Sequence, residues 1–123
     1  MWTRRAFLLL SFASVLSAQQ LKGEVDLKAD LDRAIYESSG PHVLLAMLAL
    51  DQFYQGRQIW DRQAEILKQI IYYWSTKIEA DSIGVARYSA DLAEALERAG
   101  DTAGAEQEVC FAIGIFEKSG PTV

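Results

Sequence analysis

The chain contains one short segment twice. IYESSGPHV runs from Ile35 to Val43, and IFEKSGPTV runs from Ile115 to Val123. Seven of the nine positions are identical or exchange one aromatic residue for another. Because self-similarity at a fixed spacing is typical of repeat architectures, and two units fit between the copies, we expect units of about 40 residues. The repeated segment would then be the exit of one unit and the start of the next.

Five windows of the chain place apolar residues at helical spacing, in the ranges 24–39, 42–55, 60–78, 83–99 and 102–118. Gly40 and Pro41 separate the first two windows, since glycine suits the position after a helix end and proline suits a helix start. Gly100 ends the fourth window, and Asp101 or Thr102 caps the fifth through a side-chain oxygen. No window favours a strand, so the predicted fold is all-α.

The same spacing predicts which side chains face inward. The first window is expected to bury Leu27, Leu31, Ala34 and Ile35. The fifth is expected to bury Ala105, Val109, Ala112, Ile113 and Phe116. Six aromatic residues are interpreted as fillers between neighbouring helices, with a ligand pocket as the alternative: Phe53, Tyr54, Trp60, Tyr72, Tyr73 and Trp74.

A distinctive spacing lies in LAEALERAGDTAGAEQEVCFA, residues 92–112. Leu92 and Leu96 are expected to fill the space between two helices, while small Ala93 and Ala105 let the backbones approach and Gly100 makes the turn. This spacing resembles the tetratricopeptide repeat. The resemblance implies antiparallel helix-turn-helix units stacked as a short α-solenoid. HEAT or armadillo repeats, whose periods also lie in the 40s, are the alternative.

The resemblance divides residues 19–123 into a half-unit and two full units, at 24–39, 42–79 and 83–118. A unit of about 40 to 42 residues is similar to the kinesin-light-chain variety of the repeat, because the simple tetratricopeptide period is about 34. The first full unit departs from the pattern at two positions. Asp51 stands where the second unit has Ala93, and no glycine matches Gly100.

The two full units align with one irregularity. Leu50 of the first unit matches Leu92 of the second, and Ala64 matches Ala105. The offset in residue number is smaller by one for the alanine pair than for the leucine pair. This difference predicts an extra residue in the loop of the first unit, around positions 56–61.

Residues 1–18 are interpreted as a secretory signal peptide. A basic start (MWTRR) precedes an apolar run of eleven residues (AFLLLSFASVL) and a small-residue exit, with cleavage after Ala18. The run is shorter than the roughly 20 residues that a spanning helix needs, so no stable membrane span is expected. Arg4 and Arg5 resemble the bacterial twin-arginine export signal, with the ordinary secretory route as the alternative. We therefore expect an exported protein, periplasmic or extracellular.

The charge of the mature chain argues against nucleic-acid binding. Removing residues 1–18 takes away Arg4 and Arg5 and no acid, which leaves 10 basic against 17 acidic side chains and a net charge of −7. Such a surface repels phosphate backbones. No nucleic-acid partner is expected, and an anionic membrane surface is disfavoured for the same reason.

The sequence offers no recognisable catalytic set. His42 is the only histidine and is interpreted as a solvated helix-start residue, because a catalytic or metal-binding histidine needs partners that orient it. The acids at 24–32 alternate with basic residues and are interpreted as a solvated helix face rather than a cation site. Cys110 is the only cysteine, so no internal disulfide forms, and we expect it to be half-buried. No enzyme activity and no cofactor are predicted.

A stack of helical hairpins binds other chains on its concave face, lined by the first helix of each unit. The residues predicted to contact a peptide or partner chain are Arg87, Glu94, Glu97, Arg98, Gln52 and Gln55. Hydrophobic Leu45 and Leu48 and small Ala90 lie on the same face. The alternative is a truncated or self-associating structural unit without a groove ligand, because about three units are needed for stability and the fifth helix would expose apolar side chains. A homo-oligomer through that helix follows from this alternative.

Overall fold

The computed structural model of the chain describes residues 23–80 and 82–119. The predicted signal peptide and the last four residues of the repeated segment lie outside these ranges. The described residues form five helices and no strand. Their bounds are 23–36, α2 Gly40–Arg57, α3 Trp60–Lys77, α4 Ile83–Arg98 and α5 Thr102–Lys118. The prediction of an all-α fold is confirmed.

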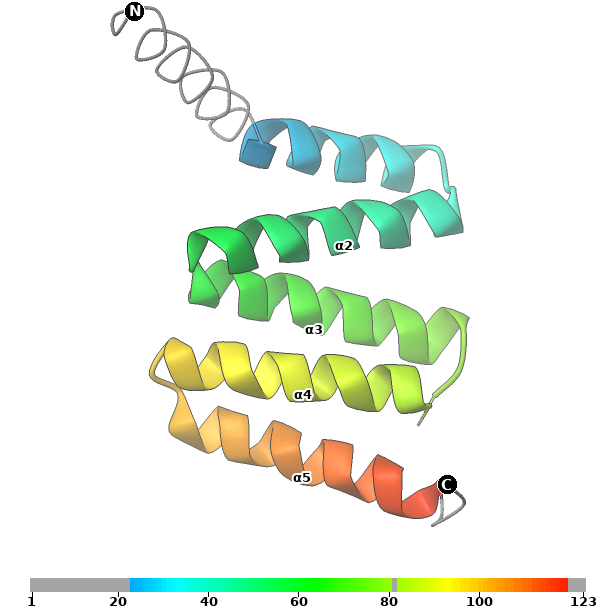
Figure 1. Cartoon of the computed structure of the whole chain (residues 1–123). Helices are drawn as coiled ribbons and strands as arrows, with labels where there is room; N and C mark the ends of the chain where they lie inside the picture. The colour runs from blue at the N-terminus through cyan, green and yellow to red at the C-terminus, as the bar shows by residue number, and fades with distance from the viewer. Residues whose placement is uncertain (1–22, 81, 120–123) are drawn as a thin grey trace, which may run out of the picture.

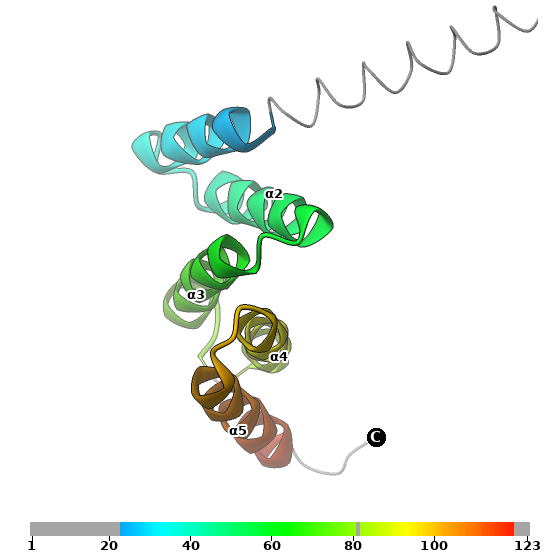
Figure 2. The same ribbon diagram turned by 90° about the vertical axis from the view of Figure 1, so that its left-hand side faces the viewer.

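The helices form a stack in which each one runs antiparallel to the helix before it (Figure 1). Seen from the side, they alternate between two layers, with α2 and α4 in one layer and residues 23–36, α3 and α5 in the other (Figure 2). Backbone contacts join α2 to α3, α3 to α4 and α4 to α5, whereas the backbones of α2 and α4 make none with each other. The α3 helix is therefore the element that holds α2 and α4 at their separation.

The turns of the two hairpins have the same conformation. Gln58 after α2 and Gly100 after α4 both adopt a left-handed backbone, with φ of 60° and 95°. In each turn, the next residue donates a backbone hydrogen bond to a carbonyl five residues earlier, at 2.9 Å in the first hairpin and 2.8 Å in the second. This is the bond pattern that closes a helix end around a left-handed residue.

The matched turns correct the predicted position of the extra residue. The α3 helix begins two residues after Gln58, and α5 begins two residues after Gly100. The loops are therefore equally long, and the loop at 56–61 contains no insertion. The predicted match of Ala64 with Ala105 is therefore off by one residue, because equal loops place Gln63 at the position of Ala105.

The core lies along the interfaces between successive helices. Its most deeply buried aliphatic side chains are Leu50, Leu67, Ile70, Val85, Leu92 and Ile115. Small Ala93 and Ala105 are buried in the same cluster as Leu92, as the repeat pattern predicted. At about 25 cal/mol for each square ångström of apolar surface removed from water, this burial along the stack is the main source of stability.

Several side chains predicted to lie in the core are exposed instead. In the first helix Leu31 and Ala34 are buried, but Ile35 is 56% exposed. In α5 the buried stripe is Ala105, Ala112 and Ile115, while the predicted Val109, Ile113 and Phe116 are exposed. The physical reason is that the backbone of α5 contacts only α4 among the described helices, so α5 buries a narrow stripe rather than a broad face.

Two further expectations are wrong in the same way. Tyr72 is 72% exposed rather than a filler between helices, although Tyr54 is buried as expected. Cys110 is exposed rather than half-buried.

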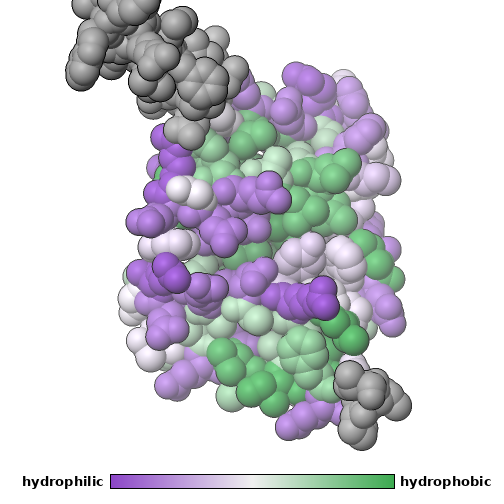
Figure 3. Space-filling model, viewed as in Figure 1, coloured by the Kyte–Doolittle hydropathy of each residue, from purple (hydrophilic) through white to green (hydrophobic). Residues whose placement is uncertain are grey.

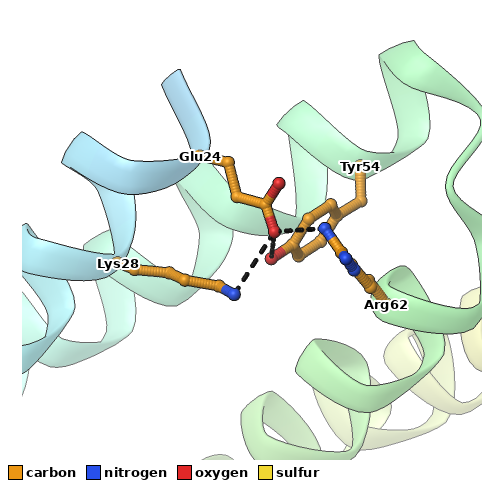
Figure 4. A network of polar contacts seen from close by, with 4 residues as sticks. All are labelled: Glu24, Lys28, Tyr54 and Arg62. Carbon is orange, nitrogen blue, oxygen red and sulfur yellow. Dashed lines mark hydrogen bonds and ion pairs between the residues drawn. The ribbon is translucent and has the colours of Figure 1, made fainter. Parts of the chain in front are cut away.

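A network of polar contacts joins the first helix to the hairpin that follows it (Figure 4). The carboxylate of Glu24 accepts a hydrogen bond from the Tyr54 hydroxyl at 3.2 Å and lies 2.5 Å from an Arg62 guanidinium nitrogen and 3.3 Å from the Lys28 ammonium. Burial raises the pKa of Glu24, but the hydrogen bond from Lys28, the charges of Arg62 and Lys28, and the Tyr54 hydroxyl outweigh it and lower the pKa. The carboxylate therefore links three helices through one oxygen.

Candidate functional site

A notch opens between α2 and α4 because the backbones of these helices do not come into contact. The start of α3 forms its floor. The cavity is about 230 Å³ and is lined by Gln55, Gln58, Trp60, Gln63, Asp91, Glu94, Ala95 and Arg98. Hydrophilic side chains gather on the face that contains the C-terminal ends of α2 and α4, at the left of the space-filling view (Figure 3).

The structure brings three of the six predicted binding residues together in this notch. Gln55 contributes from α2, and Glu94 and Arg98 contribute from α4. The other three predicted residues, Gln52, Arg87 and Glu97, are exposed on the same two helices and do not line the notch.

Arg98 is held in place by two neighbours. Its guanidinium lies 2.9 Å from a Glu94 carboxylate oxygen, one helical turn earlier. The same group lies over the Trp60 ring, 4.7 Å from the ring centroid. A cation over an indole face at this distance is attracted by the ring quadrupole. These contacts hold the Arg98 guanidinium in the notch and orient the ring of Trp60, the first residue of α3.

A polar pair that the sequence reasoning did not connect lies beneath these residues. The Gln63 side-chain amide donates a hydrogen bond from Nε2 to Asp51 Oδ1 at 3.1 Å. Gln63 is only 5% exposed, and its Oε1 atom has no hydrogen-bond partner. The carboxylate of Asp51 accepts and does not donate when ionised, so it fixes the amide with Nε2 toward α2 and Oε1 as the free acceptor.

The Asp51–Gln63 pair occupies the positions at which the second unit has two closely packed alanines. At the same offset that relates Gln58 to Gly100, Asp51 falls at the place of Ala93 and Gln63 at the place of Ala105. The first unit therefore has a hydrogen-bonded polar pair where the second has two alanines. The departure at Asp51 was the available sequence signal, since an acid at a close-packing position needs a buried partner.

Against one basic side chain, Arg98, three acidic side chains lie around the gap between α2 and α4: Asp51, Asp91 and Glu94. Burial raises the pKa of Asp51, and the hydrogen bond from Gln63 offsets part of this effect. Burial also raises the pKa of Asp91, and the charges of Asp51 and Glu94 raise it further. The Tyr88 hydroxyl has a raised pKa through burial and through Asp51 and Asp91. The carboxylates thus repel one another across the gap between α2 and α4.

The remaining candidates for chemistry lie apart from the notch. His42 is exposed near the start of α2, where its Nδ1 lies 2.7 Å from the Ser39 hydroxyl. Within residues 23–80 and 82–119, no group of three or more His, Cys, Asp or Glu side chains is arranged to hold a metal ion. In the same part of the chain, no helix has both the length and the apolar content to cross a membrane.

Comparison of this chain with family models, with curated proteins and with solved structures finds no match.

Proposed function

We propose that this chain is an exported interaction module of tetratricopeptide-like construction, which binds a peptide or an extended segment of a partner chain across the face formed by α2 and α4. The observation that carries the proposal is the notch over α3, where polar side chains from three helices converge on one cavity. Gaps between the first helices of successive units are where stacked hairpins offer a surface to other chains.

The chemistry of this face suits recognition rather than catalysis. Hydrogen-bonding groups of Gln55, Gln58 and Gln63 lie beside an indole ring and an oriented guanidinium. Aromatic and arginine side chains are enriched at the energetic centres of protein interfaces. A bound segment would pack on the Trp60 ring, and hydrogen bonds to the surrounding polar groups would set its orientation.

A peptide-display selection on the full chain tests this function. Immobilised protein is exposed to a random library of peptides about ten residues long, and enriched peptides are synthesised and measured by fluorescence anisotropy. Gln55→Trp places a large ring at the notch and is expected to weaken their binding at least tenfold, about 1.4 kcal/mol. Gln107→Trp makes the same change on an exposed position of α5 and should leave binding unaltered.

Failure to enrich any peptide above a bare surface would refute the proposal. Enriched peptides that bind the Gln55→Trp variant normally would place the interaction elsewhere on the molecule.

A second function is favoured by the outer surface of α5. Val109, Ile113 and Phe116 follow one another at spacings of four and three residues, which places them on one stripe, and each is exposed by more than two fifths. Hydrophobic side chains gather over α5 in the space-filling view (Figure 3). The corresponding role is a self-associating structural unit whose copies cover this stripe in one another.

Light scattering across a concentration series decides on this second role. With reducing agent present, because Cys110 is exposed, a dimer or larger species that dissociates in Phe116→Glu would support self-association. A monomer at all concentrations would refute it.

A further inference from the structure

The outer surface of α5 carries an apolar stripe that has a counterpart inside the stack. Three residues at spacings of four and three, each exposed by more than two fifths, form this α5 stripe: Val109, Ile113 and Phe116. Because the two hairpins have equal loops, the same positions of α3 can be read off directly. They form the α3 stripe, which consists of Leu67, Ile71 and Trp74.

The α3 stripe is covered by α4. Leu67 has no exposed surface and belongs to the same core cluster as Leu92 of α4. Ile71 and Trp74 pack against the cluster that contains Val85 of α4. The α5 stripe is the matching surface without such a cover among the described residues, since the backbone of α5 contacts only α4.

The contacts of α4 show which side chains a covering helix needs. The Trp74 ring lies against Gly84, where a Cβ atom would come within 2.7 Å of the ring. Tyr88, four residues later, places its ring centroid 5.5 Å from that of Trp74. Leu92, four residues after Tyr88, shares a cluster with Leu67. These three residues of α4 form one stripe, whose smallest member meets the largest side chain of α3.

The edge of the α5 stripe differs from that of the α3 stripe in charge. Glu106 and Glu117 are exposed beside the α5 stripe, whereas the matching residues of α3 are Ala64 and Ser75. A second α5 packed on this surface would bring the same two acids to the interface again, and the chain as a whole has a net charge of −5. Since like charges at an interface disfavour a partner and opposite charges favour it, a helix with basic residues fits better than a second copy.

We infer that the α5 stripe is the docking site for one amphipathic helix of a basic partner protein, which packs antiparallel to α5 as α4 packs on α3 (Figure 1). The helix presents a glycine or alanine to Phe116, an aromatic residue four positions later and a leucine four positions after that. It docks by laying this face on an apolar surface. The inference goes beyond the interaction proposed for the notch, and it names a partner helix where the self-associating role would place a second copy.

The test uses α4 itself as the probe. A synthetic peptide of residues 82–99 keeps the stripe of Gly84, Tyr88 and Leu92 and is held helical by a hydrocarbon staple across positions 90 and 94, which are exposed in the chain. Fluorescence anisotropy measures its binding to the full chain. Lysine replaces four residues outside this stripe, which makes the peptide basic: Ala86, Ser89, Ala93 and Glu97.

Two variants of the protein locate the bound peptide. Phe116→Glu should weaken binding at least tenfold, about 1.4 kcal/mol. Phe111→Glu makes the identical change at a phenylalanine of α5 that is about equally exposed, at 45% against 43%, and lies outside the stripe. It should leave binding unaltered, and melting of both variants shows that they are folded.

Two variants of the peptide test its chemistry on the unchanged protein. Gly84→Leu should weaken binding at least tenfold because its side chain meets Phe116, and leucine favours a helix more than glycine does, so lost helicity is not the cause. A peptide with glutamate at the four lysine positions should bind more weakly than the lysine peptide. This difference should shrink in about 0.5 M salt and in the double variant Glu106→Gln with Glu117→Gln.

Each contrary outcome has a definite meaning. A peptide that does not bind, or that binds Phe116→Glu as tightly as the parent chain, overturns the docking site. Equal affinities of the lysine and glutamate peptides overturn the basic partner. A dimer of the chain alone that Phe116→Glu dissociates assigns the stripe to a second copy instead. Gln55→Trp should not affect this peptide, so the result is independent of the function proposed for the notch.

Discussion

Gln58 and Gly100 occupy the same place in two successive hairpin turns, and both have a left-handed backbone. Glycine adopts this conformation without strain, whereas a side chain with a Cβ atom costs roughly 1 kcal/mol there. The turn at Gly100 is therefore unstrained, whereas the turn at Gln58 carries backbone strain.

Substitutions at these two turns should change the free energy of unfolding in opposite directions. Gly100→Ala is expected to lower the free energy of unfolding by about 1 kcal/mol, and Gln58→Gly to raise it by up to about 1 kcal/mol. Chemical denaturation followed by circular dichroism measures both. A Gln58→Gly variant that unfolds at markedly lower denaturant would show that the Gln58 side chain contributes more than its backbone strain costs.

The hydrogen bond between Asp51 and Gln63 predicts energetic coupling between these residues. Gln63→Ala leaves Asp51 partly buried without its donor and should cost about 1–3 kcal/mol. The double variant with Asp51→Ala reproduces the alanine pair of the second unit and should be more stable than the sum of the single changes predicts, by about 1 kcal/mol. A double-mutant cycle in urea measures this coupling, and strict additivity would show that the pair is not coupled in solution.

Glu24→Gln should destabilise the chain near neutral pH. The lowered pKa of Glu24 means that the folded chain favours the ionised carboxylate. Its contribution is present above the ordinary glutamate range and is lost as the pH falls through the lower pKa of the folded state. Thermal melting at about pH 7 and about pH 3 should therefore show a difference from the parent chain that shrinks in acid. Glu79→Gln, an exposed acid in the loop after α3, is the matched control.

Asp91→Asn is expected to have the opposite effect on folding. Because the pKa of Asp91 is raised, the folded chain binds its proton more tightly than the unfolded chain, and ionisation near neutral pH weakens the fold. After screening by solvent, the variant should gain about 0.5 kcal/mol, roughly 2–4 °C in melting temperature. The gain should vanish as the pH falls through the ordinary aspartate range. A gain in melting temperature that persisted in acid would show that the effect of Asp91→Asn does not come from the charge of the carboxylate.

The helices were predictable because periodicity and local turn chemistry determine them. Gly100 with the capping side chain of Asp101 marks one hairpin directly, and Asp101 Oδ1 accepts from the Gly104 amide as a helix cap does. The first hairpin could not be recognised in this way, because Gln58 adopts the left-handed conformation without being a residue that favours it.

The site was predictable only in part for a related reason. Repeat spacing places Gln55, Glu94 and Arg98 on exposed helix faces, and they do meet in the notch. Gln63 belongs to the site as a buried side chain of α3, and Asp91 belongs to it because the gap between α2 and α4 brings an exposed face of α4 into the notch. These are properties of how three helices pack, and helical periodicity carries no information about them.

The absence of backbone contact between α2 and α4 has a mechanical consequence. With α3 as the connection between them, flexing of the stack about α3 changes the width of the notch without breaking a backbone interface between its walls. A partner segment bound between α2 and α4, as proposed, would connect these helices and make the stack stiffer. Because such coupling is reciprocal, bending of the stack would change the affinity for that segment. Under the proposed function, the curvature of the stack and the affinity for the bound segment would therefore be coupled.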